Sequence, residues 1–402
     1  MHLSHPRIFT SVLLIITLTL LLSCEKNEPA GGPVATTKMI SAVDISSFPE
    51  IEQSQPVFYT HENQAADFLQ ILKNSGINTI RLRLWIKPQN GHAGFAEIKS
   101  FAARLKALHF RIWLSVHYSD TWADPGHQKI PAIWEGIDFE ALNDSVQNYT
   151  QSIVEQIKPD YIQIGNEINP GFLHPFGNRH TNPQQFKTLM HNAIQVVRKH
   201  SPQTQIMIHY AGISGAEKFF EELETLDYDI IGLSYYPIWH GKDLSDLEFV
   251  LKNLGEASGK ELVIAETAYP FTLGWNDYTN NIVGQEEHLI LPQYPASPQG
   301  QRAFIKAIRK LIIEQTANGL GFCYWGAELI AWKGEQATDA SPWENQALFD
   351  FKNRELPVLE EFKMLTQNNA AIFPIDQPPD TNRPAFFLPG KNEKYEVVRT
   401  GF

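Results

Sequence analysis

The sequence predicts an α/β protein, a TIM (β/α)8 barrel with long loops after its strands. Along most of the 402 residues, short apolar runs alternate with amphipathic stretches, which is the pattern of repeated β/α units. There are eight such runs, the number that closes a parallel barrel. Two of them end in a glutamate, Glu167 after YIQIGN and Glu266 after LVIA. In a closed barrel the two side chains would meet at one mouth.

The predicted elements follow in chain order. Strands are predicted at 42–46, 79–85, 111–117, 161–166, 205–210, 230–235, 262–266 and 321–325. Helices are predicted between them at 64–74, 95–108, 139–157, 183–200, 215–226, 244–254 and 300–316, with a closing helix near 356–365. Long segments follow strands three, four, seven and eight, where such barrels carry their binding loops. We therefore place the catalytic barrel at 40–369 and expect residues 370–402, rich in Pro and Asn, to pack on it or trail from it.

The N-terminal residues predict a targeting segment. Arg7 precedes an apolar stretch at 12–22 that is too short to span a bilayer and is typical of a signal peptide. Residues 21–24, LLSC, resemble a bacterial lipobox, which implies a signal peptide at 1–23 and a lipidated Cys24 that begins a flexible tether at 24–39. The alternative is an ordinary signal peptide with a chance cysteine. The lipobox implies a bacterial membrane-anchored lipoprotein on the periplasmic or cell-surface side of the outer membrane.

Composition excludes some classes of function. A formal net charge of −12 argues against binding to nucleic acid and favours a neutral glycan over a polyanionic one as substrate. The 9 Trp, 13 Tyr and 24 Phe suit stacking on sugar rings, and they equally suit a filled core. Because Cys24 is predicted to be acylated, the second cysteine, Cys323, is expected to be a buried free thiol without a disulfide.

Arginine and tryptophan end the second predicted strand in RLRLW at 81–85. The period of two places Arg81, Arg83 and Trp85 on one face. An arginine inside a barrel needs an acidic partner. We predict that Arg83, nearer the strand end, pairs with Glu266 and keeps it ionised, and that Arg81 forms a salt bridge lower in the barrel.

Three further strand ends carry candidate sugar-binding residues. After the third strand, the loop HYSDTWADPG offers His117, Asp120 and Trp122 for sugar contacts, with a structural histidine as the alternative. Asn166 precedes Glu167 and is predicted to bind a sugar hydroxyl. Tyr235, at the sixth strand end, is predicted to donate its phenol to Glu266, and Trp325, at the eighth, to form a floor under the sugar. For these last two, core packing is the alternative.

Taken together, the motifs resemble glycoside hydrolase family 53, the endo-β-1,4-galactanases of the clan A retaining glycosidases. The motifs that carry the resemblance are RLRLWIKP at 81–88, VHYSDTWADP at 116–125, GNEIN at 165–169, ETAYP at 266–270 and WENQALFD at 343–350. The resemblance implies a double displacement with retention, in which Glu167 is the general acid/base and Glu266 the nucleophile. It also implies that the substrate is the β-1,4-galactan side chains of pectic type I arabinogalactan, and that catalysis needs no cofactor.

The chain departs from the family in one loop. Several bacterial relatives carry a calcium site with acidic and carbonyl ligands after the seventh strand, whereas the loop here contains only one carboxylate, although Asn and Asp oxygens at this spacing could still hold calcium. Here the loop reads WNDYTNN at 275–281, so Asp277 and Asn280 are the predicted ligands, with a polar turn as the alternative. Two other functions stay open. One is a different retaining clan A endo-glycosidase such as a β-mannanase, and the other is a non-catalytic glycan-binding lipoprotein. We expect a monomer.

Overall fold

The computed structural model describes His2 and residues 38–367, and its main feature is a closed barrel of eight parallel strands. In chain order the barrel strands are β1 (Ile40–Asp44), β4 (Thr79–Leu84), β5 (Arg111–Val116), β6 (Tyr161–Ile164), β7 (Gln205–Ala211), β8 (Ile230–Ser234), β9 (Glu261–Thr267) and β10 (Gly319–Trp325). β1 pairs with β4 on one side and with β10 on the other, which closes the ring. The predicted TIM (β/α)8 barrel is therefore confirmed. The predicted signal peptide, Cys24 and the extension at 370–402 lie outside the described residues.

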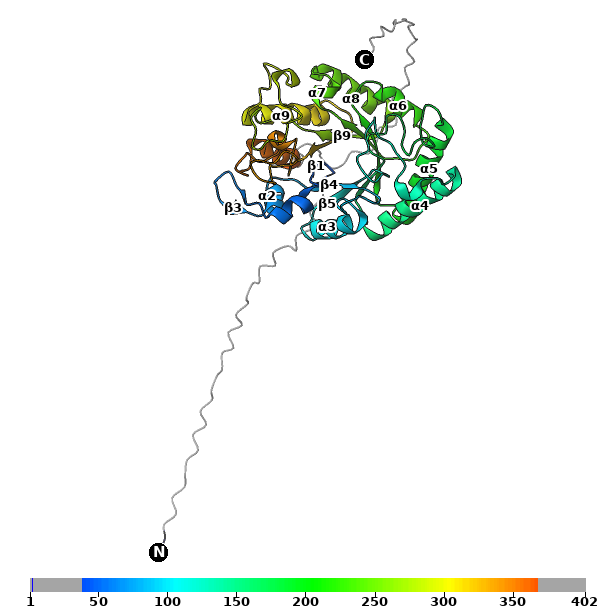
Figure 1. Ribbon diagram of the computed structural model, residues 1–402, viewed down its shortest axis with the longest axis horizontal. Coiled ribbons are helices and arrows are strands. Elements are labelled where there is room, and N and C mark those ends of the chain that lie inside the picture. Colours follow the sequence, from blue (N-terminus) through cyan, green and yellow to red (C-terminus); the bar gives the residue numbers. More distant parts are fainter. Residues whose placement is uncertain (1, 3–37, 368–402) are drawn as a thin grey trace. The chain divides into compact units, whose positions relative to one another are not determined.

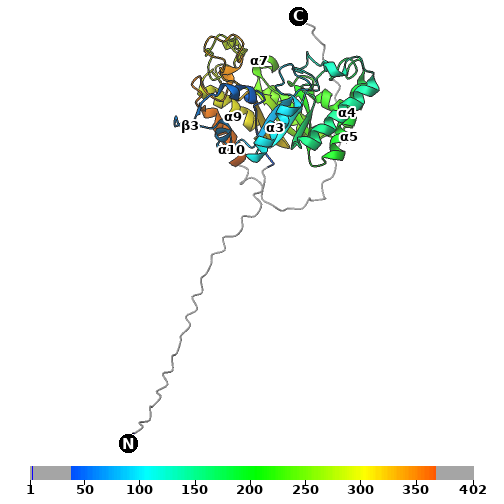
Figure 2. The same ribbon diagram turned by 60° about the horizontal axis from the view of Figure 1, so that its bottom comes forward.

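Helices surround the strands as an outer ring (Figure 1). They are α2 (Phe68–Asn74), α3 (Phe95–Ala107), α4 (Phe139–Gln156), α5 (Pro183–His200), α6 (Ala216–Glu222), α8 (Leu244–Ser258), α9 (Pro298–Glu314) and α10 (Glu360–Gln367). Two one-turn helices, α1 (Phe48–Ile51) and α7 (Pro237–His240), follow β1 and β8. In Figure 2, α7 lies at the upper edge of the barrel and α10 at the lower edge.

The helix starts follow local chemistry. The side chains of Asp67, Asp138 and Ser297 each accept a hydrogen bond from a backbone N–H of the first turn of α2, α4 and α9. The helix predicted at 64–74 therefore begins later, at Phe68. The residues before its cap instead form β3 (Ala65–Ala66), which pairs antiparallel with β2 (Phe58–Tyr59).

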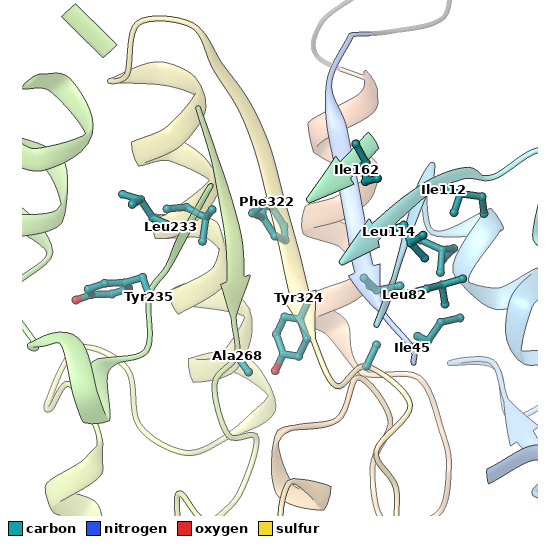
Figure 3. Close-up of a cluster of buried hydrophobic side chains, with 14 of the residues drawn as sticks. Ile45, Leu82, Ile112, Leu114, Ile162, Leu233, Tyr235, Ala268, Phe322 and Tyr324 are labelled. Carbon is teal, nitrogen blue, oxygen red and sulfur yellow. The ribbon is translucent and has the colours of Figure 1, made fainter. Parts of the chain in front are cut away.

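Alternation along the strands separates two apolar clusters. On β4, Ile80, Leu82 and Leu84 belong to the large cluster between the strands and the helices, part of which is shown in Figure 3. A smaller cluster contains Trp113, Met207, Val263 and Cys323, whose side chains fill the barrel itself. The polar residues Arg81, Ser115, Gln163 and His209 are also buried and form the next layer inside the barrel.

Two further observations concern the described part of the chain. Cys323 is buried and unpaired there, as predicted. Among residues 38–367, no helix is both long enough and apolar enough to cross a membrane.

Candidate active site

A cavity of about 720 Å³ opens at the carboxyl ends of the barrel strands. Seven of the ten predicted catalytic and sugar-binding residues line it: Glu167, Glu266, Arg83, His117, Trp122, Asn166 and Trp325. Trp85, Asp120 and Tyr235 do not. The cavity therefore brings together most of the side chains predicted from the strand ends, as expected for a barrel of this kind.

The two glutamates face each other across the cavity. One carboxylate oxygen of Glu167, one of Glu266 and a ring nitrogen of His209 all lie within 4.8 Å of one another. Burial is nearly complete at Glu266, which is 7% exposed. Two carboxyls this close in a buried site cannot both be ionised without cost, so the environment of each decides where the proton resides.

Glu266 is held by two donors. Arg81 Nη2 lies 2.7 Å from Oε1, and the Tyr236 hydroxyl donates to Oε2 at 3.0 Å. Arg81 also pairs with Asp44 through Nη1 at 2.7 Å, so the buried guanidinium has a carboxylate at each end. Burial raises the pKa of Glu266, while the charge of Arg81 and the Tyr236 hydrogen bond oppose that rise. The arginine thus favours the ionised form of Glu266.

Glu167 has weaker support for a negative charge. Ser234 Oγ donates to its Oε1 at 2.5 Å, and the structure shows no ion pair to this carboxylate within the described residues. Burial raises its pKa to about 8, and the charge of Glu266 adds to the effect. The two environments therefore favour a proton on Glu167 over one on Glu266. Its backbone has φ 47°, in the left-handed region that non-glycine residues seldom adopt, which is typical of residues held in place at a site.

The predicted partner of Glu266 was the wrong arginine. Arg81 makes the ion pair, and Arg83 makes none within the described residues. The reason is the stagger of strands in a closed barrel. Because neighbouring strands are shifted along one another, a residue near the end of its strand is not always the one level with the residues of the site. Arg81 is in register with Asp44, and Asp44 with Trp325, at the carboxyl end of β10. Arg81 is thus already level with the mouth, and Arg83 lies beyond it.

Arg83 instead lies against two indoles that meet edge to face. Its guanidinium carbon lies 4.3 Å from the ring centre of Trp85 and 4.0 Å from that of Trp122. Burial lowers its pKa to about 10, and its Nε has no hydrogen-bond partner. Trp122, 44% exposed, lines the cavity, whereas Trp85 contacts Trp122 edge to face with ring centres 5.4 Å apart. Trp85 therefore supports the wall and does not line the cavity.

The tyrosine that contacts Glu266 is Tyr236, one residue after the predicted Tyr235. Tyr236 donates to Glu266, while the Tyr235 hydroxyl donates to the Gly241 carbonyl at 2.7 Å. Along β8, Ile231, Leu233 and Tyr235 face the helices, and Figure 3 draws Tyr235 and Leu233 among the buried apolar side chains. The alternate residues, Ser234 and then Tyr236, point toward the inside of the barrel. The strand period contained this signal, and the prediction did not apply it.

Asp120 holds two loops together and does not line the cavity. Its two carboxylate oxygens accept hydrogen bonds from the backbone N–H groups of Lys87 and Ala132, each at 2.8 Å, so it joins two loops. The carboxylate of this loop that lines the cavity is Asp124. The structure therefore does not bring Asp120 into the cavity, because both of its carboxylate oxygens already bind backbone groups of the loops.

His117 and Asn166 line the cavity with most of their polar atoms already engaged. His117 Nδ1 accepts from the Ala123 N–H at 3.1 Å, and burial keeps its pKa well below the usual range, so its Nε2–H is the donor left for a ligand. Asn166 donates to the Ala123 carbonyl at 2.8 Å and accepts from Arg81 Nη2 at 2.8 Å. Asn166 thus fixes the loop and the arginine as well as lining the cavity.

Aromatic residues form one side of the cavity. Trp325 contacts Trp343 edge to face with ring centres 4.8 Å apart, and Trp343 stacks with Trp239 at 6.1 Å. Trp239 is 53% exposed. Such rings can stack on the apolar faces of sugars. The prediction included Trp325 but not Trp343 or Trp239, because neither lies at the end of a strand.

Part of the predicted calcium loop offers free oxygens. Asp277 is buried, and its Oδ2 has no hydrogen-bond partner; the same holds for Asn281 Oδ1 and Glu344 Oε2. Glu344 contacts this turn through Oε1, which accepts the Asn276 N–H at 2.6 Å. Asn280 is exposed, and the amide oxygen among these buried unpaired atoms is that of Asn281. These oxygens fit part of a calcium shell, which takes six to eight oxygen ligands.

A calcium ion held by these oxygens is expected to raise thermal stability, so that its removal lowers it. A ligand that binds only the folded state adds about 2.7 kcal/mol at 100 times its Kd, so Tm should fall in EDTA and return with added CaCl2. Differential scanning calorimetry measures this, with Glu344→Gln as the variant in which the calcium response should shrink. Equal Tm values in EDTA and in calcium would contradict a site at Asp277, Asn281 and Glu344.

A second buried acid, Glu328, predicts a pH dependence of stability. Its Oε1 accepts the Ser47 N–H at 2.8 Å, its Oε2 has no partner, and burial raises its pKa from 4.5 to about 8. Between these pH values the unfolded chain loses the proton and the folded chain keeps it, so this group lowers stability as pH rises. Glu328→Gln should therefore raise Tm at pH 8.5 by roughly 2 °C or more relative to its effect at pH 5. Calorimetry at both pH values checks this, and an equal effect at both would refute it.

Comparisons with known proteins show the family to which the chain is similar. The model of glycosyl hydrolase family 53 matches residues 40–362. An arabinogalactan endo-β-1,4-galactanase from Cellvibrio japonicus (strain Ueda107) is 31% identical over 359 residues, 84% of this chain and 94% of that protein. An endo-β-1,4-galactanase from Bacillus subtilis (strain 168) is 30% identical over 373 residues, 81% and 85% of the two chains. Among solved structures, the Ignisphaera aggregans GH53 catalytic domain aligns with TM-score 0.76 and 36% identity, covering 84% of this chain and 98% of its own.

Proposed function

Because the chain belongs to glycosyl hydrolase family 53 and is a glycoside hydrolase, we propose that it is an endo-β-1,4-galactanase. The substrate is a neutral polymer, the β-1,4-galactan side chains of pectic type I arabinogalactan. The observation that carries the proposal is the pair Glu167 and Glu266 in a cavity walled by tryptophans, in a chain whose relatives are galactanases. The net charge of −12 agrees with a neutral glycan.

The proposed mechanism is a double displacement. Glu266, kept ionised by Arg81, attacks the anomeric carbon while Glu167 gives its proton to the leaving oxygen. Glu167 then removes a proton from the water that releases the sugar from Glu266. The separation supports retention, because retaining enzymes hold their carboxyl groups roughly 5–5.5 Å apart and inverting enzymes roughly 6.5–9.5 Å apart. Side chains supply all these steps, so the reaction needs no cofactor.

The test is product analysis on a panel of polymers. Purified protein is incubated with linear β-1,4-galactan, β-mannan and β-glucan, and the products are separated by chromatography. We expect galacto-oligosaccharides of mixed length from galactan and negligible release from the others. Cleavage of mannan instead of galactan would keep the carboxylate pair and overturn the substrate. A single mono- or disaccharide product from the earliest times would overturn endo action.

We further propose that the enzyme is a monomer held at a bacterial membrane by lipid on Cys24, on the periplasmic or cell-surface side of the outer membrane. The motif LLSC at 21–24 supports the anchor. Cys24→Ser should therefore move the protein from the membrane fraction to the soluble fraction of expressing bacteria, as measured by immunoblot. Cys323→Ser, at a buried thiol, is the matched control and should stay with the membrane. Membrane association of both variants would contradict the anchor.

A further inference from the structure

A chain of buried polar groups leads through the barrel to Glu167. Gln163 Nε2 on β6 lies 3.0 Å from His209 Nδ1 on β7, and His209 Nε2 lies 2.8 Å from Ser234 Oγ on β8. Ser234 Oγ in turn lies 2.5 Å from Glu167 Oε1. Gln163, His209 and Ser234 are all 0% exposed. Because water does not reach these groups, each proton among them must be directed by a neighbour.

The direction of the chain follows from His209. Burial, together with the charge of Arg81, keeps its pKa well below the usual range, so the ring is neutral and has one N–H. Two donors face Nδ1, the Gln163 amide and the Glu167 backbone N–H at 3.4 Å. The Asn166 Oδ1 atom also lies 3.2 Å from Nδ1, but it already accepts a shorter hydrogen bond from Arg81 Nη2 at 2.8 Å. Gln163 is oriented by Trp113 Nε1, which donates to its Oε1 at 3.2 Å. Nδ1 is therefore an acceptor, and Nε2 carries the proton that His209 donates to Ser234.

The serine then has one proton to give. Since Ser234 Oγ accepts from His209, its own hydroxyl proton is donated to Glu167 Oε1. An oxygen that accepts this bond is a poor place for the acid's own proton. We propose that Ser234, oriented by His209, is a positioning residue that keeps the transferable proton of Glu167 on Oε2, ready for the leaving oxygen. The inference rests on the acid/base role proposed for Glu167.

The proton balance of both steps agrees with this role. In the first step, the Oε2–H bond breaks as the proton passes to the leaving oxygen, and the Ser234 bond stabilises the carboxylate that forms. In the second step, a water proton returns to Oε2 and the hydroxide portion binds the anomeric carbon as the bond to Glu266 breaks. Ser234 keeps its proton throughout, so it acts only through Glu167.

Other groups near Glu167 set the background for a pH test. The negative charges of Glu266 and Asp124 raise the pKa of Glu167, and the charge of Arg81 lowers it. Tyr236, whose own pKa is raised by burial, and His209, which is neutral, complete the surroundings. The Ser234 hydrogen bond lowers the pKa of Glu167. Removal of this hydrogen bond should therefore raise the pKa of Glu167 and move the loss of activity at alkaline pH to higher pH.

The experiment compares wild type, Ser234→Ala and Ser234→Thr on two substrates over a pH series. One is β-1,4-galactan, whose leaving sugar needs a proton, and the other is 2,4-dinitrophenyl β-galactobioside, whose phenolate leaves without one. For Ser234→Ala we expect kcat/KM on galactan to fall about tenfold, a fraction of the full effect of a general acid, and the alkaline limb to move up. The aryl substrate should change less than about twofold, and Ser234→Thr should regain most of the loss, because it keeps the hydroxyl.

Equal losses on both substrates, or an unmoved alkaline limb, would overturn the inference. Ser41→Ala is the matched control, a strand serine equally buried on β1 that bonds the Phe362 carbonyl and should match wild type. If Ser234→Ala does not fold, as judged by circular dichroism, Ser234→Cys replaces it, because its thiol is a weak donor of similar size. Wild-type cleavage of another polymer would refute the galactan proposal alone, and the same comparison on that polymer would still test Ser234.

Discussion

Replacing Glu266 by alanine is expected to lower kcat on β-1,4-galactan by about 10⁴-fold or more, because loss of a nucleophile removes the covalent route. Arg81 and Tyr236, which bond Glu266, would remain and leave a small anion site. Azide should enter it, attack the anomeric carbon from the same side, and restore activity. Reducing-sugar assays measure the loss, and NMR of the azide product should show the inverted, α configuration.

Glu261→Ala is the control for this variant. Glu261 begins the same strand, β9, at the opposite end of the barrel, so its replacement should leave activity near that of wild type. A Glu266→Ala variant that keeps more than about a tenth of wild-type activity would contradict a nucleophilic role. Azide rescue with retained β configuration would assign the nucleophile to another residue.

Replacing Glu167 by alanine is expected to lower kcat/KM on galactan by about 10²–10⁴-fold, the usual contribution of a general acid. The wild-type pKa of about 8 means that Glu167 is protonated below that pH, so wild-type activity should fall as pH rises through about 8. Glu167→Ala should lack this alkaline limb. A substrate with a dinitrophenolate leaving group should restore most of the first step, since it needs no proton.

The control here is Glu140→Ala, an exposed glutamate in the first turn of α4. It should keep both the rate and the alkaline limb. An alkaline limb that persists in Glu167→Ala would place the titrating group elsewhere, and Tyr236 would be the next candidate, because it donates to Glu266. An equal loss on galactan and on the aryl substrate would contradict an acid role.

The sequence predicted the barrel because its strands are short, apolar and separated by amphipathic helices. All eight predicted strands lie within a few residues of the observed ones. The two glutamates were found because each closes a strand. Tyr236 was also within reach, since strand alternation that sends Leu233 and Tyr235 to the helix side leaves Tyr236 on the side of the cavity, which it lines.

Other features depend on geometry that no local pattern contains. Along β9, Leu262 and Ile264 face the helices, so strict alternation would send Glu266 there as well. A register shift opposite Leu233 and Ser234 of β8 pairs Ser234 with Glu266 and turns the glutamate into the cavity. The pairing of Arg81 with Glu266 likewise depends on strand stagger. The His209–Ser234 chain requires three strands to be placed side by side.

The most direct test of the account follows the first new reducing ends released from β-1,4-galactan by proton NMR. A double displacement on Glu266 predicts that the β anomer appears first and that the α anomer grows only as mutarotation proceeds. This result would establish both the galactan substrate and the retaining geometry of the two glutamates. Early appearance of the α anomer would contradict the mechanism, and absence of any new reducing end would contradict the substrate.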